Sequence, residues 1–371
     1  MAANLHVDLY PSMDEYDPAD LGVSQVMMKE DGTNAKFFSN VKPNVVLKHF
    51  EWMANYGITG VFHMRFMSGL MSNDGNNPNR IWKTMVLTNV RNAAESTGRT
   101  FAVSYNIAGM EDSVIDEIKV DWTRLVDEEK ITSSNRYIRQ GGLPVLRIYG
   151  IGFKAVNVTD TTKLADLIDW FQNKADPKYK VFLVGGVPSR WRDRTNDSRE
   201  EAAWKGIYDS LDGIHPWHVG RWTTIANFGT YYSSIISADA TYCAGKGILY
   251  MPTMWPGFSW HNLKRGDSPI NSIPRLGGNF MWAQAYRYMT NTKITSIWMA
   301  QFDEVDEGTA IFKVASNANE APAEGDWLTL DADGQSLPSD WYLRLCGEAQ
   351  KMLEKKISLT SKIPIKPGLF V

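Results

Sequence analysis

Short apolar runs alternate with amphipathic segments along most of the chain. The runs are rich in β-branched and aromatic residues, which favour strands. The segments between them repeat apolar residues at helical spacing. The predicted strands span residues 5–10, 60–66, 100–107, 143–150, 180–186, 213–220, 247–255 and 294–302. The predicted helices span residues 44–57, 80–96, 113–128, 161–173, 199–210, 225–243, 274–290 and 340–356.

Eight strand–helix units in succession predict the α/β class and a (β/α)8 TIM barrel. An open doubly wound sheet is the competing arrangement, but no Gly-rich phosphate loop follows the first run, LHVDLYPSM. No repeat, linker or low-complexity tract interrupts the alternation, so residues 1–371 are predicted to form a single catalytic domain. Two long loops, 11–42 and 255–273, follow the first and seventh strands, and loops of this length are usually functional.

Composition excludes several classes of function. The net charge is −3 and no Lys/Arg-rich stripe is present, so nucleic acid is not an expected partner. No apolar run approaches the roughly 20 residues that a membrane span requires. Cys243 and Cys346 are far apart and match no metal-ligand spacing, so no disulfide framework, metal or cofactor is expected. The oligomeric state cannot be predicted.

The N-terminal stretch lacks the basic and apolar regions of a signal peptide. Residues 1–3, Met-Ala-Ala, are compatible with a start that replaces a removed signal. In that case the protein would be periplasmic or secreted.

The ends of the predicted strands carry most of the polar and aromatic candidates. In a (β/α)8 barrel the active site lies at the carboxyl ends of the strands, so these side chains are expected to bind the substrate. An alternative is that histidines and tyrosines inside the barrel only satisfy one another's hydrogen bonds. The candidate substrate-binding residues are Asp8, Tyr10, His63, Arg65, Tyr105, Arg147, Tyr149, Arg190, Trp191, His215, Trp217, His218, Trp255, Trp260 and His261.

Tryptophan is unusually frequent, with 14 residues in the chain. Aromatic rings near strand ends suit the apolar faces of sugars, although sites for apolar cofactors also use Trp. Those on or beside the loops after strands are Trp191, Trp217, Trp222, Trp255 and Trp260. Those on predicted helices are expected to pack against the barrel: Trp52, Trp82, Trp122, Trp170, Trp204, Trp282 and Trp341.

Residues 303–307, Asp-Glu-Val-Asp-Glu, place four carboxylates directly after the last predicted strand. If the chain turns there, Glu304 and Glu307 can face one cavity. Close carboxylates share a proton, which supplies an acid and a base near neutral pH. Retaining glycosidases hold such a pair about 5–5.5 Å apart. The alternatives are an acidic surface turn or a Ca²⁺ site built from Asp303 and Asp306.

Two further patterns leave other chemistries open. The arginines at strand ends favour either an anionic substrate or simple neutralisation of nearby carboxylates. The histidines of HPWH (215–218) would share one side only on a helix, and a metal-dependent hydrolase would use His6, His63 and His215. No nucleophile elbow, HExxH motif or phosphate loop is present.

The stretch FDEVDEGTAIF (302–312) resembles the F-N-E-W-x-E-G-T-x-I signature after strand eight in glycoside hydrolase family 99. The stretches DLYPSMDEYDPADLG and HFEWMANYGITGVFHMRF are similar to the broader group of bacterial family 71/99-like proteins. The resemblance covers most of the chain in architecture, and only the strand-eight motif matches residue by residue. This chain has Asp303 where the family has Asn, Val305 where it has Trp, and Asp306 where it often has His.

The resemblance implies a retaining endo-α-mannosidase-like enzyme on a (β/α)8 barrel. By position, Glu304 would be the base that acts on the sugar's own 2-hydroxyl to give a 1,2-anhydro sugar. Glu307 would protonate the leaving oxygen and then activate water. The expected substrate is an oligosaccharide or polysaccharide with an α-linked, mannoside-like bond. The alternatives are a non-catalytic carbohydrate-binding barrel and a glycosidase that acts on an anionic polysaccharide.

Overall fold

The computed structural model describes residues 5–70 and 77–368, so the interpretation of residues 1–3 lies outside the described part. The chain divides into two compact units, which are described separately. Unit 1 comprises residues 1–58, 219–234 and 253–371, and unit 2 comprises residues 59–218 and 235–252. That residues 1–371 form one catalytic domain stays a prediction.

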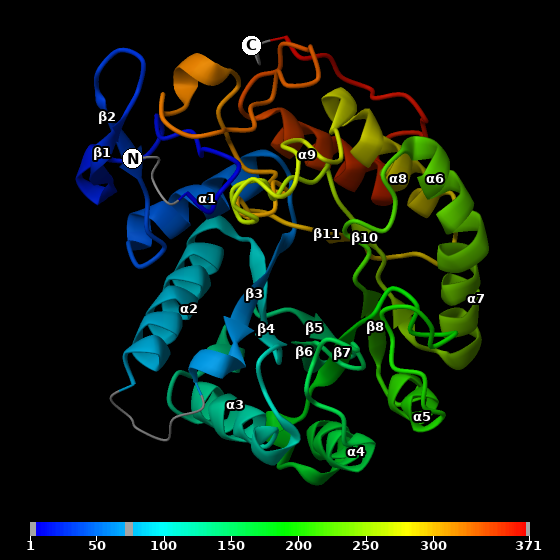
Figure 1. The fold of residues 1–371 in the computed structure, drawn as a ribbon. Helices are drawn as coiled ribbons and strands as arrows, with labels where there is room; N and C mark the ends of the chain where they lie inside the picture. Colours follow the sequence, from blue (N-terminus) through cyan, green and yellow to red (C-terminus); the bar gives the residue numbers. More distant parts are fainter. Residues whose placement is uncertain (1–4, 71–76, 369–371) are drawn as a thin grey trace. The chain divides into compact units, whose positions relative to one another are not determined.

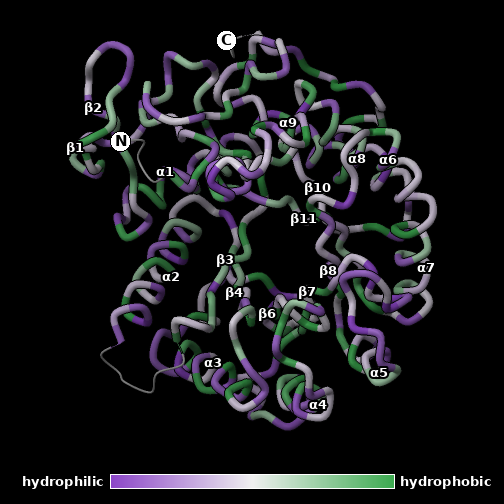
Figure 2. The backbone as a smooth tube through the Cα atoms, in the orientation of Figure 1, coloured by the Kyte–Doolittle hydropathy of each residue, from purple (hydrophilic) through white to green (hydrophobic). Residues whose placement is uncertain are grey.

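Unit 2 is built on a parallel sheet whose strands follow one another in chain order (Figure 1). Its order is β3-β4-β6-β7-β8-β9, and the short β5 (Arg139–Gln140) pairs antiparallel with β6. Figure 2 shows hydrophobic residues along these strands. The strands are β3 (Gly60–Phe66), β4 (Thr100–Asn106), β6 (Leu143–Tyr149), β7 (Phe182–Val187), β8 (Gly213–Pro216) and β9 (Leu249–Tyr250).

Helices separate the strands of this sheet, and α2, α3 and α4 lie on its outer side in Figure 1. Each helix buries an apolar stripe; on α3 the stripe contains Ile118, Trp122 and Leu125. Asn77 caps the start of α2 by accepting from the Asn79 amide. The helices of unit 2 are α2 (Pro78–Thr97), α3 (Glu117–Asp127), α4 (Thr161–Asp169), α5 (Ala203–Asp209) and α7 (Ser237–Lys246).

Strand register decides which side chains of this sheet share a face. Neighbours paired in a parallel sheet point to the same side, and successive residues point to opposite sides. Ser104 pairs with Arg147, and Gly186 pairs with both Tyr149 and His215, so Ser104, Arg147, Tyr149 and His215 belong to one face. Arg65 pairs with Tyr105 on the opposite face.

Unit 1 contains a short parallel pair, an antiparallel hairpin and four α-helices in the part that the structure describes. β10 (Thr253–Met254) pairs with β11 (Trp298–Met299), and β1 (Gly22–Met28) pairs with β2 (Asn34–Phe37). The helices are α1 (Pro43–Asn55), α6 (Ile225–Tyr231), α8 (Asn279–Met289) and α9 (Trp341–Leu353).

Three strand predictions need correction. Residues 5–10 form no strand, because the amides of Asp8 and Leu9 donate to a single carbonyl, that of Val305. The predicted strand 247–255 is two strands, β9 and β10, separated by Pro252, which has no N–H for a ladder. The last predicted strand, 294–302, is reduced to β11.

The hairpin β1–β2 lies inside the segment 11–42 that the sequence predicts as a loop. Its turn contains Asp31 and Gly32, and the Asp31 carboxylate accepts from the Thr33 amide at 2.9 Å. Gly32 has a φ of +80°, which a residue with a side chain rarely adopts. Asp-Gly between strand-forming residues is a hairpin signal that the prediction overlooked.

No helix in the described ranges, 5–70 and 77–368, is both long enough and apolar enough to span a bilayer.

Candidate active site

The acid turn, which we define as residues 303–307, follows β11 in unit 1. The chain reverses here because the Ala310 amide donates to the Glu304 carbonyl at 2.8 Å and the Phe312 amide donates to the Phe302 carbonyl at 3.0 Å. The predicted bend after the last strand is therefore present, and it places four acidic side chains on one short turn.

The backbone of the acid turn is held from both flanks. The Asp8 amide donates to the Val305 carbonyl at 2.9 Å, and the Ser259 amide donates to the Glu307 carbonyl at 3.0 Å. These bonds fix the carbonyls of two turn residues against segments that lie far away in the sequence. Such support holds a constellation of side chains in a defined geometry.

Buried Arg275 and Gly308 secure the chain just after the turn. One guanidinium nitrogen of Arg275 donates to the carbonyls of Gly308 and Ala310, each at 2.8 Å. Gly308 has a φ of +61°. A Cβ at this position would lie 2.9 Å from the Ser259 amide nitrogen, so a larger residue would disrupt the turn.

Glu304 has the most strongly perturbed carboxyl of the turn. Burial raises its pKa to about 7, and the charges of Asp306 and Glu307 add to the effect. Its oxygens accept from the Gln301 side-chain amide at 3.1 Å and from the Asp306 backbone amide at 3.2 Å. Glu304 can therefore hold or release a proton near neutral pH.

Glu307 and Asp306 complete the acidic group. Burial raises the pKa of Glu307, the charge of Asp306 raises it further, and Lys264 opposes the shift. Burial also raises the pKa of Asp306, against the influence of His6. Because Asp306 acts on both glutamates, the three carboxyls form a coupled group in which not every member is ionised near neutral pH.

Asp303 serves a different part of unit 1. Burial of the carboxyl group raises the pKa of Asp303. Because the residue as a whole is exposed, water stabilises its charged form more than that of Glu304. Asp303 bonds to the Asn40 side chain, and its charge contributes, after burial, to the raised pKa of Tyr16. Tyr16 in turn bonds to buried His49 on α1 at 2.6 Å. Asp303 thus bonds to the segment 11–42, and its charge also raises the pKa of Glu304, by less than the charges of Asp306 and Glu307 do.

Two of the predicted substrate-binding residues in unit 1 have structural partners. Asp8 is buried, and its carboxylate accepts from Ser259, His261 and Asn262. The hydroxyl of buried Tyr10 donates to the Lys36 carbonyl at 2.8 Å, which fixes the hairpin strand β2. Neither side chain needs a ligand to satisfy its polar atoms.

The segment after β10 carries the other three candidates of unit 1. Trp255 is fully buried and packs against Trp222 and Phe280. Trp260 is half-buried; its indole N–H donates to Ser268, and the Lys264 ammonium lies 4.5 Å from its ring centroid. His261 lies beside Trp260 and uses its Nδ1–H to donate to the Ser268 carbonyl at 2.6 Å. Trp260 is thus the aromatic candidate of this segment whose ring stays partly accessible.

In unit 2 the structure brings together Arg147, Tyr149, His215 and Trp217, which we call the arginine cluster. The Arg147 guanidinium donates to the Ser104 hydroxyl at 2.9 Å and to the Nδ1 of His215 at 2.8 and 3.1 Å. It also lies over the Tyr149 ring at 4.9 Å, and Tyr149 meets Trp217 edge to face. Four of the five side chains named for the predicted strands 143–150 and 213–220 thus form one contact group.

Protonation in the arginine cluster follows from these contacts. Arginine only donates hydrogen bonds, so the Nδ1 of His215 must accept and its proton must sit on Nε2. Burial lowers the pKa of His215 well below its usual value, and the charge of Arg147 lowers it further. His215 is therefore neutral.

The other candidates on β3 and β4 face the helices. Arg65 is fully buried and makes a two-pronged ion pair with Asp121 of α3, with N–O distances of 2.7 and 2.9 Å. The Tyr105 hydroxyl donates to the same carboxylate at 2.8 Å. His63 shares the face of Arg65 by alternation, and burial lowers its pKa to about 4. The structure does not bring these three residues to the face of Arg147.

The remaining candidates after β7 and β8 are also buried or paired with other protein residues. Arg190 forms an ion pair with Asp193 three residues later. Trp191 is 1% exposed, and its indole N–H donates to Asp239 at 3.1 Å. His218 is buried. No group of three or more His, Cys, Asp or Glu residues within the described ranges is arranged to hold a metal ion.

The helical tryptophans pack as predicted with one clear exception. Five of them are buried: Trp52, Trp122, Trp204, Trp282 and Trp341. Trp170 is half-buried. Trp82 is 65% exposed near the start of α2, so the prediction that it packs against the barrel is wrong. Its neighbours Ile81 and Met85 are exposed as well.

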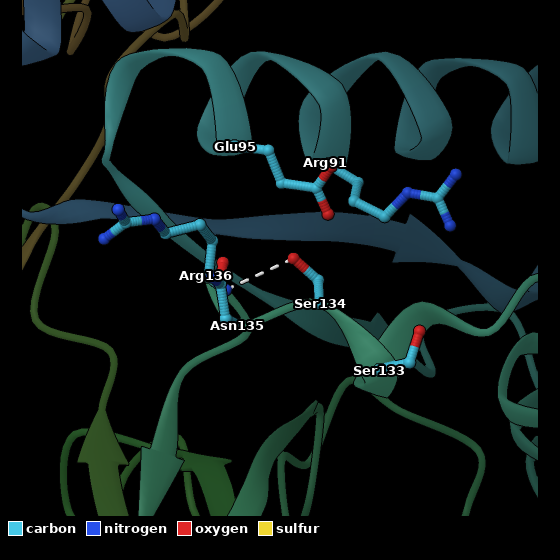
Figure 3. Close-up of a pocket in the computed structure, with 6 residues that line it drawn as sticks. All are labelled: Arg91, Glu95, Ser133, Ser134, Asn135 and Arg136. Atoms are coloured by element: carbon cyan, nitrogen blue, oxygen red, sulfur yellow. Dashed lines mark hydrogen bonds between the residues drawn. The ribbon is translucent and has the colours of Figure 1, made fainter.

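A polar pocket of about 500 Å³ in unit 2 is not at the strand ends expected of an active site (Figure 3). It lies between α2 and residues 133–136, and the Arg136 carbonyl accepts from Phe101 at the amino end of β4. Arg91 donates to the Glu129 carbonyl, and the guanidinium groups of Arg91 and Arg136 point apart in Figure 3. The active sites of (β/α)8 enzymes lie at the opposite, carboxyl ends of the strands, so this pocket is not the expected active site.

The sequence analysis missed the residues that support these sites. Ser259, Arg275 and Gln301 hold the acid turn, and Ser104 and Asp121 hold the two buried arginines. Asp121 had a readable signal, because an acid within the apolar stripe of α3 requires a buried partner. The others are ordinary polar residues whose role depends on the tertiary fold.

Comparison with known proteins gives a likeness of fold. A solved family 99 endo-α-mannosidase from Bacteroides thetaiotaomicron, in complex with bis-tris-propane, superposes with a TM-score of 0.63 at 14% identity. The match covers 95% of this chain and 91% of that one. A second structure of the family 99 endo-α-mannosidase from this organism matches with a TM-score of 0.63 and 15% identity, covering 90% and 84% of the two chains.

No protein-family model matches the chain, and no curated protein matches it. At 14–15% identity the likeness concerns the fold, and with the parallel sheet and alternating helices it confirms the predicted α/β class of (β/α)8 type.

Proposed function

We propose that the chain is a retaining glycoside hydrolase that cleaves an α-linked, mannoside-like glycan with Glu304 and Glu307. The observation that carries the proposal is the acid turn itself: two glutamates with raised pKa values stand on one turn whose backbone is anchored on both flanks. The fold likeness to endo-α-mannosidases over 95% of the chain and the strand-eight motif support the same conclusion.

The proposed reaction divides the chemistry between the two glutamates. The Glu304 carboxylate takes the proton of the sugar's 2-hydroxyl, and that oxygen attacks C1 while the bond from C1 to the leaving oxygen breaks. Glu307 gives its proton to the leaving oxygen. Glu307 then takes a proton from water, which opens the 1,2-anhydro ring at C1 as the 2-oxygen recovers its proton. Two inversions at C1 give net retention.

The raised pKa values let the pair carry a proton near neutral pH, and the division requires that proton to be on Glu307 although the pKa of Glu304 is raised more strongly. A base is effective when its pKa lies near the working pH, and the pKa of Glu304 is about 7. Glu307 must hold a proton before cleavage, and both burial and the neighbouring Asp306 favour its protonated form. Because the two glutamates belong to one coupled group, a single shared proton serves the first step.

The glycan is proposed to be the partner of this site, with the half-buried Trp260 as a stacking surface in unit 1. Its ring lies in the segment that also holds the Glu307 carbonyl through Ser259. A pyranose presents C–H bonds that suit an aromatic face. Residues 1–371 are proposed to act as one catalytic domain.

The proposal is tested by hydrolysis assays on a panel of glycans that includes α-mannosides, α-glucosides and anionic polysaccharides. Glu304→Gln and Glu307→Gln should each lower kcat/KM by about 100- to 10,000-fold, the usual range for a lost acid or base. Asp303→Asn is the control and should have a much smaller effect, because Asp303 bonds to Asn40 and its charge is the smallest of the three neighbouring charges that raise the pKa of Glu304. Hydrolysis at the wild-type rate in either glutamine variant would refute the roles of the glutamates.

Product analysis separates the remaining alternatives. Proton NMR of the first product should show the α anomer, as retention requires, and the β anomer would exclude the two-step route. If wild-type protein binds a glycan by calorimetry and hydrolyses nothing on the panel, the chain is a carbohydrate-binding protein instead. Turnover confined to uronic or sulfated substrates would assign it to anionic polysaccharides.

A further inference from the structure

Asp8 is completely buried, although it lies in a segment without regular secondary structure. It is 0% exposed. One carboxylate oxygen accepts from the Ser259 hydroxyl at 2.5 Å and from the His261 amide at 2.8 Å, and the other accepts from the Asn262 amide at 2.8 Å. Charge-assisted bonds of this kind are among the strongest in proteins. The carboxylate is thus committed to the segment 259–262.

The same residues reach the acid turn through the backbone. The Asp8 amide donates to the Val305 carbonyl, between the two glutamates, and the Ser259 amide donates to the Glu307 carbonyl. Ser259 approaches Gly308 so closely that a Cβ there would lie 3.0 Å from the Ser259 Cβ. Asp8 therefore joins the start of the chain, the segment 259–262 and the acid turn at one point.

We propose that Asp8 is a positioning residue that fixes Glu307 through the segment 259–262, and that it does not contact the substrate. In its catalytic consequence this inference rests on the proposed function. Asp8 is 0% exposed, so a sugar hydroxyl could reach its carboxylate only if the residues that cover it moved away.

The position of Glu307 matters most when the leaving group is poor. An aglycone that leaves as a stable anion needs little help from a proton donor, whereas an alkoxide needs full protonation in the transition state. A displaced Glu307 should therefore slow cleavage of poor leaving groups far more than that of good ones. A change that only weakens the fold would slow both alike.

Asp8→Asn is the main test. The asparagine side chain has one oxygen, so its NH₂ group must face at least one donor of the segment 259–262. We expect kcat/KM for the methyl glycoside of the substrate sugar to fall by about 100-fold, the effect of a misplacement near 1 Å. For the dinitrophenyl glycoside we expect a change of less than about threefold, because proton donation contributes little there. Glu307→Gln should show the same leaving-group pattern.

Two further variants keep the test sharp. Ser259→Ala removes only the hydroxyl contacts and should give a smaller loss with the same pattern, even if Asp8→Asn folds poorly. Asp326→Asn is the matched control, because Asp326 meets the same segment through an exposed carboxylate 3.4 Å from the Nε2 of His261. It should leave both substrates unaffected.

Hydrogen exchange of the intact protein gives a readout that does not depend on turnover. Peptides that cover 259–262 and 303–308 should exchange faster in Asp8→Asn than in wild type or Asp326→Asn, while the rest of the chain is unchanged. Wild-type exchange in these peptides would overturn the proposal, as would equal losses for both leaving groups. If the wild-type protein hydrolyses no glycoside, the proposed function fails, and the exchange result still decides whether Asp8 holds the turn.

Discussion

Buried charge is handled in opposite ways in two regions of the molecule. In the acid turn of unit 1, Asp306 and Glu307 lie close enough to Glu304 for their like charges to raise its pKa. In unit 2, the Asp121 carboxylate is more deeply buried than Glu304, but it accepts from Arg65 and Tyr105. Although burial opposes ionisation, the bond from Arg65 lowers the pKa of Asp121. One region retains unfavourable charge, and the other neutralises it.

The difference distinguishes a pair that stabilises the fold, Arg65–Asp121, from a group of carboxyls that can exchange protons, the acid turn. The backbone of the acid turn is anchored, while its carboxylates keep few hydrogen bonds and their protons can move. The Arg65–Asp121 pair joins opposite charges through two hydrogen bonds and fixes a helix to the sheet. Sites that must transfer protons commonly retain groups that destabilise the fold. Removing a charge should therefore have opposite effects on stability in the two regions.

The largest expected effect is at the Arg65–Asp121 pair. Arg65→Met would leave the buried Asp121 carboxylate without its main partner, with the Tyr105 hydroxyl and the more distant Arg124 at 3.5 Å remaining. We expect a loss of about 3–5 kcal/mol in the free energy of unfolding, as for other broken buried pairs. Urea denaturation measures it. A loss below 1 kcal/mol would show that the Arg65–Asp121 pair contributes little to the stability of the fold.

The arginine cluster should respond less strongly. His215→Ala removes the acceptor for two N–H groups of Arg147, which costs about 1–3 kcal/mol when a buried donor loses its partner. His215→Asn is the control, because its side-chain oxygen can accept in place of Nδ1. Equal stability of the two variants by thermal unfolding would show that this hydrogen bond does not stabilise the cluster.

In the acid turn the sign should reverse. The pKa of Glu304 is raised from 4.5 to about 7 in the folded protein, so the folded state binds more protons than the unfolded state between these values. Stability contributed by this group is present below pH 4.5 and is lost as pH rises through about 7. After allowance for its partial exposure, Glu304→Gln should raise the free energy of unfolding by about 1–2 kcal/mol at pH 8. The stability curves of the variant and wild type should converge at pH 4, and a destabilised variant at pH 8 would contradict the account.

The smallest effect is expected at Asp306, whose charge acts on both Glu304 and Glu307. Asp306→Asn removes a negative charge that raises the pKa of Glu304 and of Glu307. Both pKa values should fall, so the pH profile of kcat/KM should move toward lower pH with little change in its height. A profile that stays in place would mean that Asp306 does not tune the pair.

Much of the fold could be predicted from periodicity. The bounds of β3 were predicted to the residue, and those of β4 and β6 to within one residue at the carboxyl end. Long helices such as α1 and α2 begin and end within two residues of the prediction. The prediction failed where local preference and tertiary contacts disagree, as at residues 5–10, whose amides bond to the acid turn instead of a neighbouring strand.

The candidate site was predictable only in part, and the reason is the alternation of strand faces. Spacing shows that His63 and Arg65 share a side, and that Arg147 and Tyr149 share a side. It does not show that these two sides are opposite, because that depends on the register between strands. The acid turn was recognisable because its four carboxylates are adjacent in the sequence, and its anchors Ser259 and Arg275 were not, because they lie far away along the chain.

The most direct test of the account is a carboxyl titration of the acid turn. Protein enriched with ¹³C at the side-chain carboxyls of glutamate would be followed by NMR from pH 4 to 9, with Glu304→Gln and Glu307→Gln used to assign the signals. The account predicts that Glu304 titrates near pH 7 and that Glu307→Gln lowers the pKa of Glu304. Two carboxyls that titrate independently near 4.5 would contradict it.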